Sequence, residues 1–189
     1  MAAPDTAQRI LDIAERLVQT RGFNGFSYAD IAQTMRVTKA SLHYHFPAKA
    51  DLGKRLIERY ERNFLAALDA IDAAAKDAPD KLRRYAALYE EVLRDNRMCL
   101  CGMLAAEFGT LPKSMRDEMR HYFDANEKWL VGVLQDGKKA KSLKFPGTPA
   151  ETAQGLIGTL EGAMMIARSY ADVGRFRSVT GRMLEGLAA

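Results

Sequence analysis

Apolar residues recur every three or four positions through most of the chain, which is the spacing that places them on one face of an α-helix. The longest series is Leu52, Leu56, Tyr60, Phe64 and Leu68. The 189 residues include only 14 glycines and 6 prolines. The stretches between them are rich in Ala, Leu, Glu and Arg, which favours helices because straight-chain residues lose little rotamer freedom there. The sequence therefore predicts an all-α protein.

Capping residues and helix breakers mark the ends of the predicted helices. Gly22 is placed as a C-cap, Ser27 with Asp30 forms a candidate capping box, Thr38 is a candidate N-cap, and Pro47 stops the helix before it. The segment from Asp136 to Thr148, with four lysines, predicts a solvated and mobile loop. The predicted helices cover residues 6–20, 28–35, 39–46, 48 to beyond 68, 80–96, 101–108, 113–135, 149–172 and 174–187.

The net charge is concentrated near the N-terminus. Lys and Arg number 28 and Asp and Glu 24, which gives a net charge of +4. The window from Arg36 to Arg55 accounts for all of it, because Asp51 is the one acid among five basic residues there, namely Arg36, Lys39, Lys49, Lys54 and Arg55. A local excess of this kind attracts a polyanion.

Two short predicted helices in this region are joined by the turn Met35-Arg36-Val37. This is the spacing of a helix-turn-helix, whose second helix enters the DNA major groove. The side chains expected to pack the motif are Ile31, Ala32, Val37, Leu42 and Phe46, and those left facing outward on the second helix are Lys39, Ala40, His43 and Tyr44. Polar, cationic and aromatic groups on that face can reach base edges and phosphates.

The block Tyr28–Ala32, the block Val37–Phe46, Lys49 and Leu52 together resemble the DNA-binding signature of TetR-type (TetR/AcrR) transcriptional regulators. The resemblance spans about residues 6–55. It implies a three-helix DNA-binding domain at 1–50 and a C-terminal helical bundle at 51–189 that binds an effector and dimerises, with the fourth helix shared. Arg36 stands where such turns usually have Gly, and His43 replaces a frequent Tyr, so no operator sequence follows from the resemblance.

Nine residues are candidates for the DNA interface. Lys39 is expected to contact a base and Lys49 a phosphate, while Ser27 and Thr38 either cap helices only or also meet phosphates at the helix N-termini. The full set is Ser27, Tyr28, Thr38, Lys39, Ala40, Ser41, His43, Tyr44 and Lys49. His43 and His45 are two positions apart and point to different sides of a helix, so no metal site is expected, and no cofactor.

The segment Met98–Glu107, followed by Leu111-Pro112 and Met115-Arg116, resembles a subgroup in which some members sense electrophiles or oxidants through a cysteine at the position of Cys99. The reacting species is a thiolate, which Arg97 would favour. The alternative is an inert buried thiol. The candidate effector residues, which are either cavity lining or plain core, are Cys99, Met103, Phe108, Phe123, Trp129, Met164 and Arg168.

The predicted helix 149–172 carries Gly155, Gly158 and Gly162, which keep one face small. A second helix can approach such a face closely. Together with Phe176, Val179 and Met183 on the next helix, these glycines predict a four-helix interface between two copies of the chain.

The function predicted is a homodimeric, cytoplasmic repressor that a small molecule or a cysteine modification releases from a palindromic operator in double-stranded DNA. Neither a secretory signal nor a membrane span is recognisable, and two cysteines one residue apart build neither a disulfide framework nor a zinc site. The alternatives are a ligand- or protein-binding module without DNA binding and a cysteine-dependent enzyme. The enzyme reading is disfavoured because His121 is the one histidine outside the DNA-binding block.

Overall fold

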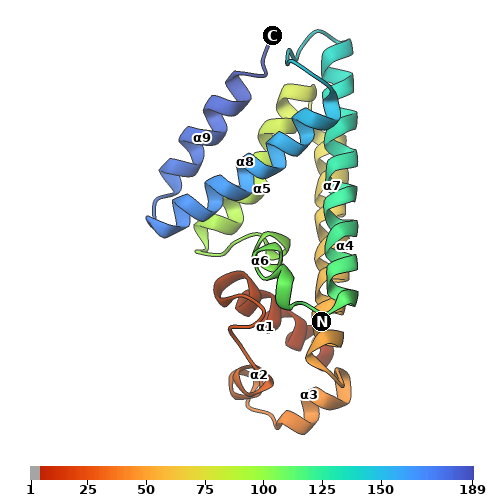
Figure 1. Cartoon of the computed structure of the whole chain (residues 1–189), viewed down its shortest axis with the longest axis vertical. Coiled ribbons are helices and arrows are strands. Elements are labelled where there is room, and N and C mark those ends of the chain that lie inside the picture. The colour runs from red at the N-terminus through yellow and green to blue at the C-terminus, as the bar shows by residue number, and fades with distance from the viewer. Residues whose placement is uncertain (1–4) are drawn as a thin grey trace. The chain divides into compact units, whose positions relative to one another are not determined.

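The computed structural model describes residues 5–189, and these residues form nine α-helices and one short 3₁₀ helix (Figure 1). The all-α prediction is confirmed. Among these residues no helix has both the length and the apolar character that crossing a bilayer requires. The helices are α1 (Thr6–Arg21), α2 (Tyr28–Met35), α3 (Lys39–His45), α4 (Lys49–Ala74), α5 (Ala78–Arg94), α6 (Leu100–Ala106), η1 (Phe108–Thr110), α7 (Lys113–Lys139), α8 (Pro149–Ser169) and α9 (Val173–Glu185).

The chain divides into two compact units, and α4 and α7 contribute residues to both of them. The first unit consists of the described residues up to Arg62 together with Leu100–Tyr122, and the second of Asn63–Cys99 and Phe123–Ala189. This division differs from the one expected after residue 50. The difference arises because α6 packs against α1, so a segment of the predicted C-terminal bundle groups with the N-terminal helices.

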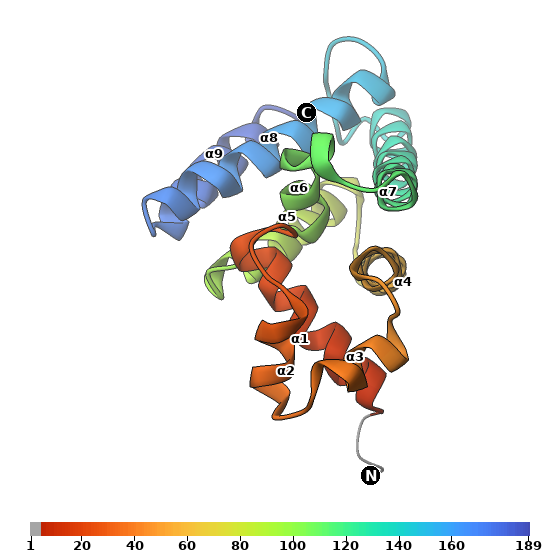
Figure 2. The same ribbon diagram turned by 60° about the horizontal axis from the view of Figure 1, so that its bottom comes forward.

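In the first unit, α1 and α3 each pack against α2 (Figure 2). Ile10, Ala14 and Val18 form the inner face of α1 at helical spacing, and all three are fully buried. Ile31 of α2 and Leu42 of α3 are fully buried as well. Burying these side chains fixes the position of α3, which leaves its other face available to solvent.

In the second unit, α5, α8 and α9 pack against one another. The connection between α7 and α8 is shorter than expected and in part buried, because α7 continues to Lys139 and the side chains of Leu143 and Phe145 are covered. Leu143 forms an antiparallel bridge with Ala188. The expectation of a solvated loop after Asp136 was therefore wrong, since two apolar side chains of this segment are buried and one of them, Leu143, pairs with the C-terminal end of the chain.

Candidate nucleic-acid interface

The start of α2 is fixed by a capping box. The Ser27 amide and hydroxyl both donate to Asp30 Oδ2 at 2.8 Å, and Ser27 Oγ accepts from the Ala29 amide at 3.2 Å. The hydrogen bonds from Ser27 lower the pKa of Asp30. Thr38 caps α3 in the same way, because its Oγ1 accepts from the Ser41 amide at 3.4 Å. Both capping roles predicted from the sequence are confirmed.

The turn between α2 and α3 contains a left-handed residue. Arg36 has φ 58° and ψ 44°, and its amide donates to the carbonyls that end α2. This is the conformation that glycine adopts without a steric penalty, whereas an L-residue pays about 1–2 kcal/mol for it. Arg36 thus adopts, at a steric cost, the left-handed conformation that glycine would adopt without one. Its exposed side chain adds a positive charge beside α3.

The outward face of α3 is as open as predicted. Lys39, Ala40, His43 and Tyr44 are exposed, and Tyr44 reaches 85% exposure, unusual for so large an aromatic side chain. Lys39 takes part in none of the ion pairs and hydrogen bonds recorded for residues 5–189. Helix α3 thus exposes a cation and an aromatic ring on one face and buries its opposite face. This is the arrangement of a recognition helix that binds in the DNA major groove.

The conformation of His43 is set by its neighbours. Its Nδ1 lies 3.0 Å from the Pro47 carbonyl, which can only accept, so this nitrogen carries the proton and Nε2 remains for a partner outside the subunit. The ring also packs on Tyr28 with 4.8 Å between centroids. Tyr28 itself is buried, its hydroxyl donates to the Phe46 carbonyl at 2.8 Å, and burial with the charge of Asp51 raises its pKa to about 12. Tyr28 is therefore a packing residue of α2, and its placement in the DNA interface does not agree with the structure.

The ammonium group of Lys49, which is half-buried, points to the turn between α1 and α2. Its Nζ donates to the carbonyls of Phe23 and Phe26 and lies 4.5 and 4.2 Å from the centroids of their rings. Burial lowers the pKa of Lys49, while the charges of Glu107 and Asp30 act in the opposite direction. The expected phosphate contact thus competes with this geometry, because the turn between α1 and α2 already engages two of the three N–H donors of Lys49.

The carboxylate of Glu107, directly after α6, also holds the turn between α1 and α2. The sequence did not predict this contact. Glu107 accepts the amide of Phe23 at 2.6 Å and the amide of Asn24 at 3.1 Å. Gly22 has φ 81°, and a Cβ there would come 2.7 Å from a Glu107 oxygen. The turn is therefore fixed by an anion on its amides and by a cation, Lys49, on its carbonyls.

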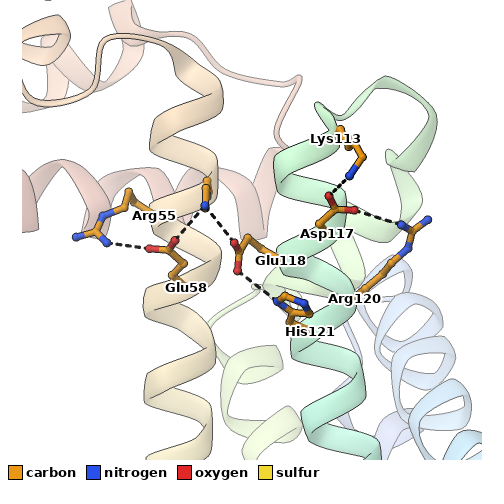
Figure 3. A network of polar contacts seen from close by, with 8 residues as sticks. Arg55, Glu58, Lys113, Asp117, Glu118, Arg120 and His121 are labelled. Carbon is orange, nitrogen blue, oxygen red and sulfur yellow. Dashed lines mark hydrogen bonds and ion pairs between the residues drawn. The ribbon is translucent and has the colours of Figure 1, made fainter.

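The positive window of the sequence is partly neutralised. Lys54 lies between Glu58 at 3.7 Å and Glu118 at 3.3 Å, and Arg55 pairs with Glu58 at 2.8 Å. Figure 3 shows this network continuing from Glu118 to His121 on α7. Since Lys49 is also engaged, Arg36 and Lys39 are the members of the window that leave their charge unpaired beside α3.

The candidate effector residues do not form one cluster. Phe108 belongs to the first unit, lies exposed, and has the guanidinium groups of Arg116 and Arg120 over its ring, so it lines no cavity there. Met103, in the same unit, is half-buried. The others belong to the second unit, where Cys99 and Met164 are buried and Phe123, Trp129 and Arg168 are half-buried.

Trp129 borders a hollow in the surface of the second unit. The hollow has a volume of about 470 Å³, and its lining includes Asp72 and Lys81. Asp72 pairs with Lys81 and accepts the indole N–H of Trp129 at 2.9 Å. The wall of the hollow that Asp72 and Lys81 form is therefore polar, and these two residues make an ion pair there.

The glycine face of α8 is open. A Cβ added at Gly155, Gly158 or Gly162 would meet nothing within 4 Å. Val179 on α9 is 45% exposed, and Met183 is half-buried. Phe176 is only 1% exposed, because it lies on the face of α9 that packs against α5 and α8. Its assignment to the dimer interface was wrong, since it belongs to the core of its own subunit.

Both the N-terminal and the C-terminal parts of the chain match models of known protein families. Residues 10–56 match the family model for bacterial regulatory proteins of the tetR family, and residues 78–181 match that for the tetracyclin repressor-like C-terminal domain. Together the two models cover the helix-turn-helix and most of the second unit.

Individual relatives agree along nearly the whole chain. A transcriptional regulator of the TetR family from Agrobacterium tumefaciens is 34% identical, with a TM-score of 0.94 and 97% of each chain covered. A TetR transcriptional regulator from Legionella pneumophila is 31% identical, with a TM-score of 0.90 over 99% of this chain and all of that one. The HTH-type transcriptional repressor NemR of Escherichia coli K12 is 25% identical over 88% of this chain and 87% of its own. The protein is thus a member of the TetR family and a DNA-binding transcriptional regulator.

Proposed function

We propose that the protein is a homodimeric repressor that binds a pseudo-palindromic operator and leaves it when a small molecule occupies the second unit. The observation that carries the DNA-binding part is the open face of α3, with Lys39 unpaired and Tyr44 85% exposed. Relatives named as transcriptional repressors, such as NemR, support repression over activation. In this proposal the cytoplasm is where the protein works.

Dimerisation is supported by the surface of α8 and α9. Three glycines spaced by three and four residues leave a flat strip that a partner backbone can approach closely. Exposed apolar side chains stand beside it, namely Met165, Ile166, Tyr170 and Val179. We propose the second copy of the chain as their partner, with Gly155, Gly158, Gly162, Val179 and Met183 in the interface.

Two routes of release were open, and the burial of Cys99 favours the non-covalent one. Its side chain is 2% exposed and lies close to the carboxyl of Glu161. Burial and a neighbouring carboxylate both disfavour the thiolate that an electrophile would attack. Arg97, the expected activating cation, is paired with Asp95 at 2.7 Å.

Selection of bound duplexes from a random DNA pool tests the proposal. The enriched sequences are expected to contain two inverted half-sites about one helical turn apart or a small multiple of it. Lys39→Ala should relax the preference at one position of each half-site, and Lys113→Ala, which removes an exposed lysine of α7, should not. Recovery of no preferred sequence would contradict the proposal.

Cys99→Ser separates the two routes of release. The variant is expected to bind operator and respond to effector as the wild type does. Loss of the response to an electrophile or mild oxidant, with mass spectrometry showing a modified Cys99 in the wild type, would instead establish the covalent route.

A further inference from the structure

The end of α7 and its connection to α8 carry four lysines close together. They are Lys138, Lys139, Lys141 and Lys144, and we call them the lysine cluster. All four are exposed, and the stretch 137–150 contains no acidic residue. The cluster therefore gathers a local charge of +4, which equals the net charge of the whole chain.

These charges are not neutralised inside the subunit. None of the ion pairs recorded for residues 5–189 involves the lysine cluster, whereas Lys54 and Arg55 of the N-terminal window are both paired with glutamates. The nearest acids along the chain are Asp136 and Glu151. Glu151 is occupied in capping α8, where it accepts the amide and the hydroxyl of Thr148 at 2.7 and 2.8 Å. Asp136 offsets at most one of the four charges, so an anion from outside the subunit can balance the others.

The backbone that carries the lysine cluster is held in place. The amides of Ser142 and Leu143 donate to the carbonyl of Gly137 at 2.9 and 3.1 Å, and the amide of Lys144 donates to the carbonyl of Leu187 at 2.8 Å. The apolar side chains of the segment are buried, as described above. Because the turn is already ordered, a partner that binds the lysines does not have to order the backbone as well.

A surface hollow of about 340 Å³ adjoins the connection. Its lining includes Ala140 and Ser142 together with Lys76, an exposed lysine just before α5. Asp77 and Asp136 also line it, so the hollow is mixed in charge. It is therefore poorly suited to enclose a small anion. This arrangement favours a long polyanion that lies across the exposed lysines.

The composition of this surface favours the phosphates of DNA over those of a membrane. Segment 137–148 exposes no aromatic or large aliphatic side chain, because Leu143 and Phe145 are buried. Protein surfaces that lie on a bilayer usually insert such side chains, whereas the backbone of a duplex requires only cations. Lysine meets a phosphate as a point charge and lacks the planar fork of arginine, so the contact does not depend on sequence.

We propose that the lysine cluster is a second DNA-binding surface, which holds the phosphate backbone of duplex DNA without reading its sequence. The surface belongs to the second unit, outside the helix-turn-helix, and its role does not depend on repression or on an effector. It adds a sequence-independent part to the affinity for DNA, and contacts of this kind let a protein slide and hop along the duplex.

Lysine acetylation followed by mass spectrometry of the peptides tests the proposal residue by residue. The full-length protein is labelled alone and with an excess of random-sequence duplex, at low and at high salt. We expect the duplex to slow the acetylation of Lys139, Lys141 and Lys144 at least about tenfold at low salt, and this protection to disappear at high salt. Lys113 and Lys128, exposed elsewhere on the chain, are internal controls and should react equally with and without DNA.

The salt dependence of binding to the same duplex gives a second measurement. Each phosphate contact adds about 0.9 to the slope of log affinity against log salt concentration, so replacing three lysines of the cluster by Gln should lower the slope by about 2–3. Lys138 is kept, because its Nζ donates to the Gly147 carbonyl at 3.4 Å and lies 4.8 Å from the centroid of the Phe145 ring. The control loses the same charge at exposed positions and should keep the wild-type slope. The cluster variant is Lys139→Gln, Lys141→Gln and Lys144→Gln, and the control is Arg83→Gln, Lys113→Gln and Lys128→Gln.

Unchanged acetylation of the lysine cluster in the presence of duplex, or equal slopes for the two variants, would overturn the proposal. Protection of the cluster by phosphatidylserine vesicles but not by duplex would overturn it as well, since the partner would then be a membrane. The DNA selection described above is a separate test. Protection of the cluster by random duplex without any selected sequence contradicts the proposed repressor and leaves this surface standing, whereas protection of Lys39 alone leaves operator binding standing and removes the second surface.

Discussion

Replacing Glu161 by Gln should stabilise the protein, and by more as the pH rises. Burial raises the pKa of the Glu161 carboxyl to about 7 in the folded protein, against an ordinary value of 4.5. Between these two values the folded state holds a proton that the unfolded state has released, so the free energy of unfolding falls as the pH rises through this window. The amide of the Gln variant does not titrate, so the variant escapes this loss.

The magnitude follows from the two pKa values. They differ by about 2.5, and each unit corresponds to about 1.4 kcal/mol, so the wild type loses about 3 kcal/mol between pH 4.5 and pH 7. At pH 5 the variant and the wild type should differ little from this source. At pH 8 the full difference is expected, which is a large part of the 5–15 kcal/mol typical of whole domains.

Urea denaturation at pH 5 and pH 8, at one fixed protein concentration, measures the difference. Trp129 fluorescence follows the unfolding of the second unit, to which Glu161 also belongs. Glu91→Gln serves as the control, because its exposed carboxyl should give the same small change at both pH values. A Glu161→Gln effect that is the same at pH 5 and pH 8 would refute the reasoning, since it would mean that the carboxyl has its ordinary pKa in the folded protein.

Four further changes test other parts of the structure. Arg36→Gly removes left-handed strain and should raise the free energy of unfolding by about 1 kcal/mol in urea denaturation, so a loss of stability would count against the strained turn. Glu107→Ala leaves two amides of the turn without their charged acceptor and should cost about 1.5–3 kcal/mol, whereas an unchanged urea midpoint would show that water replaces it. Gly158→Leu should weaken the dimer by about 1–3 kcal/mol in sedimentation while the equally open Gly132→Leu of α7 does not, and equal behaviour would remove α8 from the interface. Lys39→Ala should weaken operator binding by about 1–3 kcal/mol in a gel-shift titration if Lys39 reads a guanine, and an unchanged affinity would exclude it from base recognition.

The sequence predicted the helices and caps of the helix-turn-helix well because their determinants are local. The bonds of the two caps join residues two or three positions apart, from Ser27 to Asp30 and from Thr38 to Ser41, and such spacings can be read along the chain. The turn at Arg36 follows from helix lengths and helical periodicity. The outward face of α3 then follows from which positions the core occupies.

The errors concern residues whose partners are far away in sequence. The Nζ of Lys49 reaches carbonyls 23 and 26 positions earlier, and the carboxylate of Glu107 reaches an amide 84 positions earlier. Neither distance is encoded in a local pattern, so Lys49 looked like a free cation and Glu107 like a surface acid. Phe176 was placed in the dimer interface for the same reason, because helical spacing does not tell which of two apolar faces meets its own subunit.

The bond between Glu107 and the turn after α1 has a consequence for how the DNA-binding part of this chain can be exchanged with that of another protein. A chimera that takes only the first 62 residues of this chain brings the turn amides but leaves their acceptor to the other parent. The structure therefore predicts that operator preference transfers intact only when residues 100–122 travel with the N-terminal helices, or when the recipient already has an acid at position 107. In this chain, the helices that bind DNA and the residues that hold their turn in place therefore come from two separate segments of the sequence.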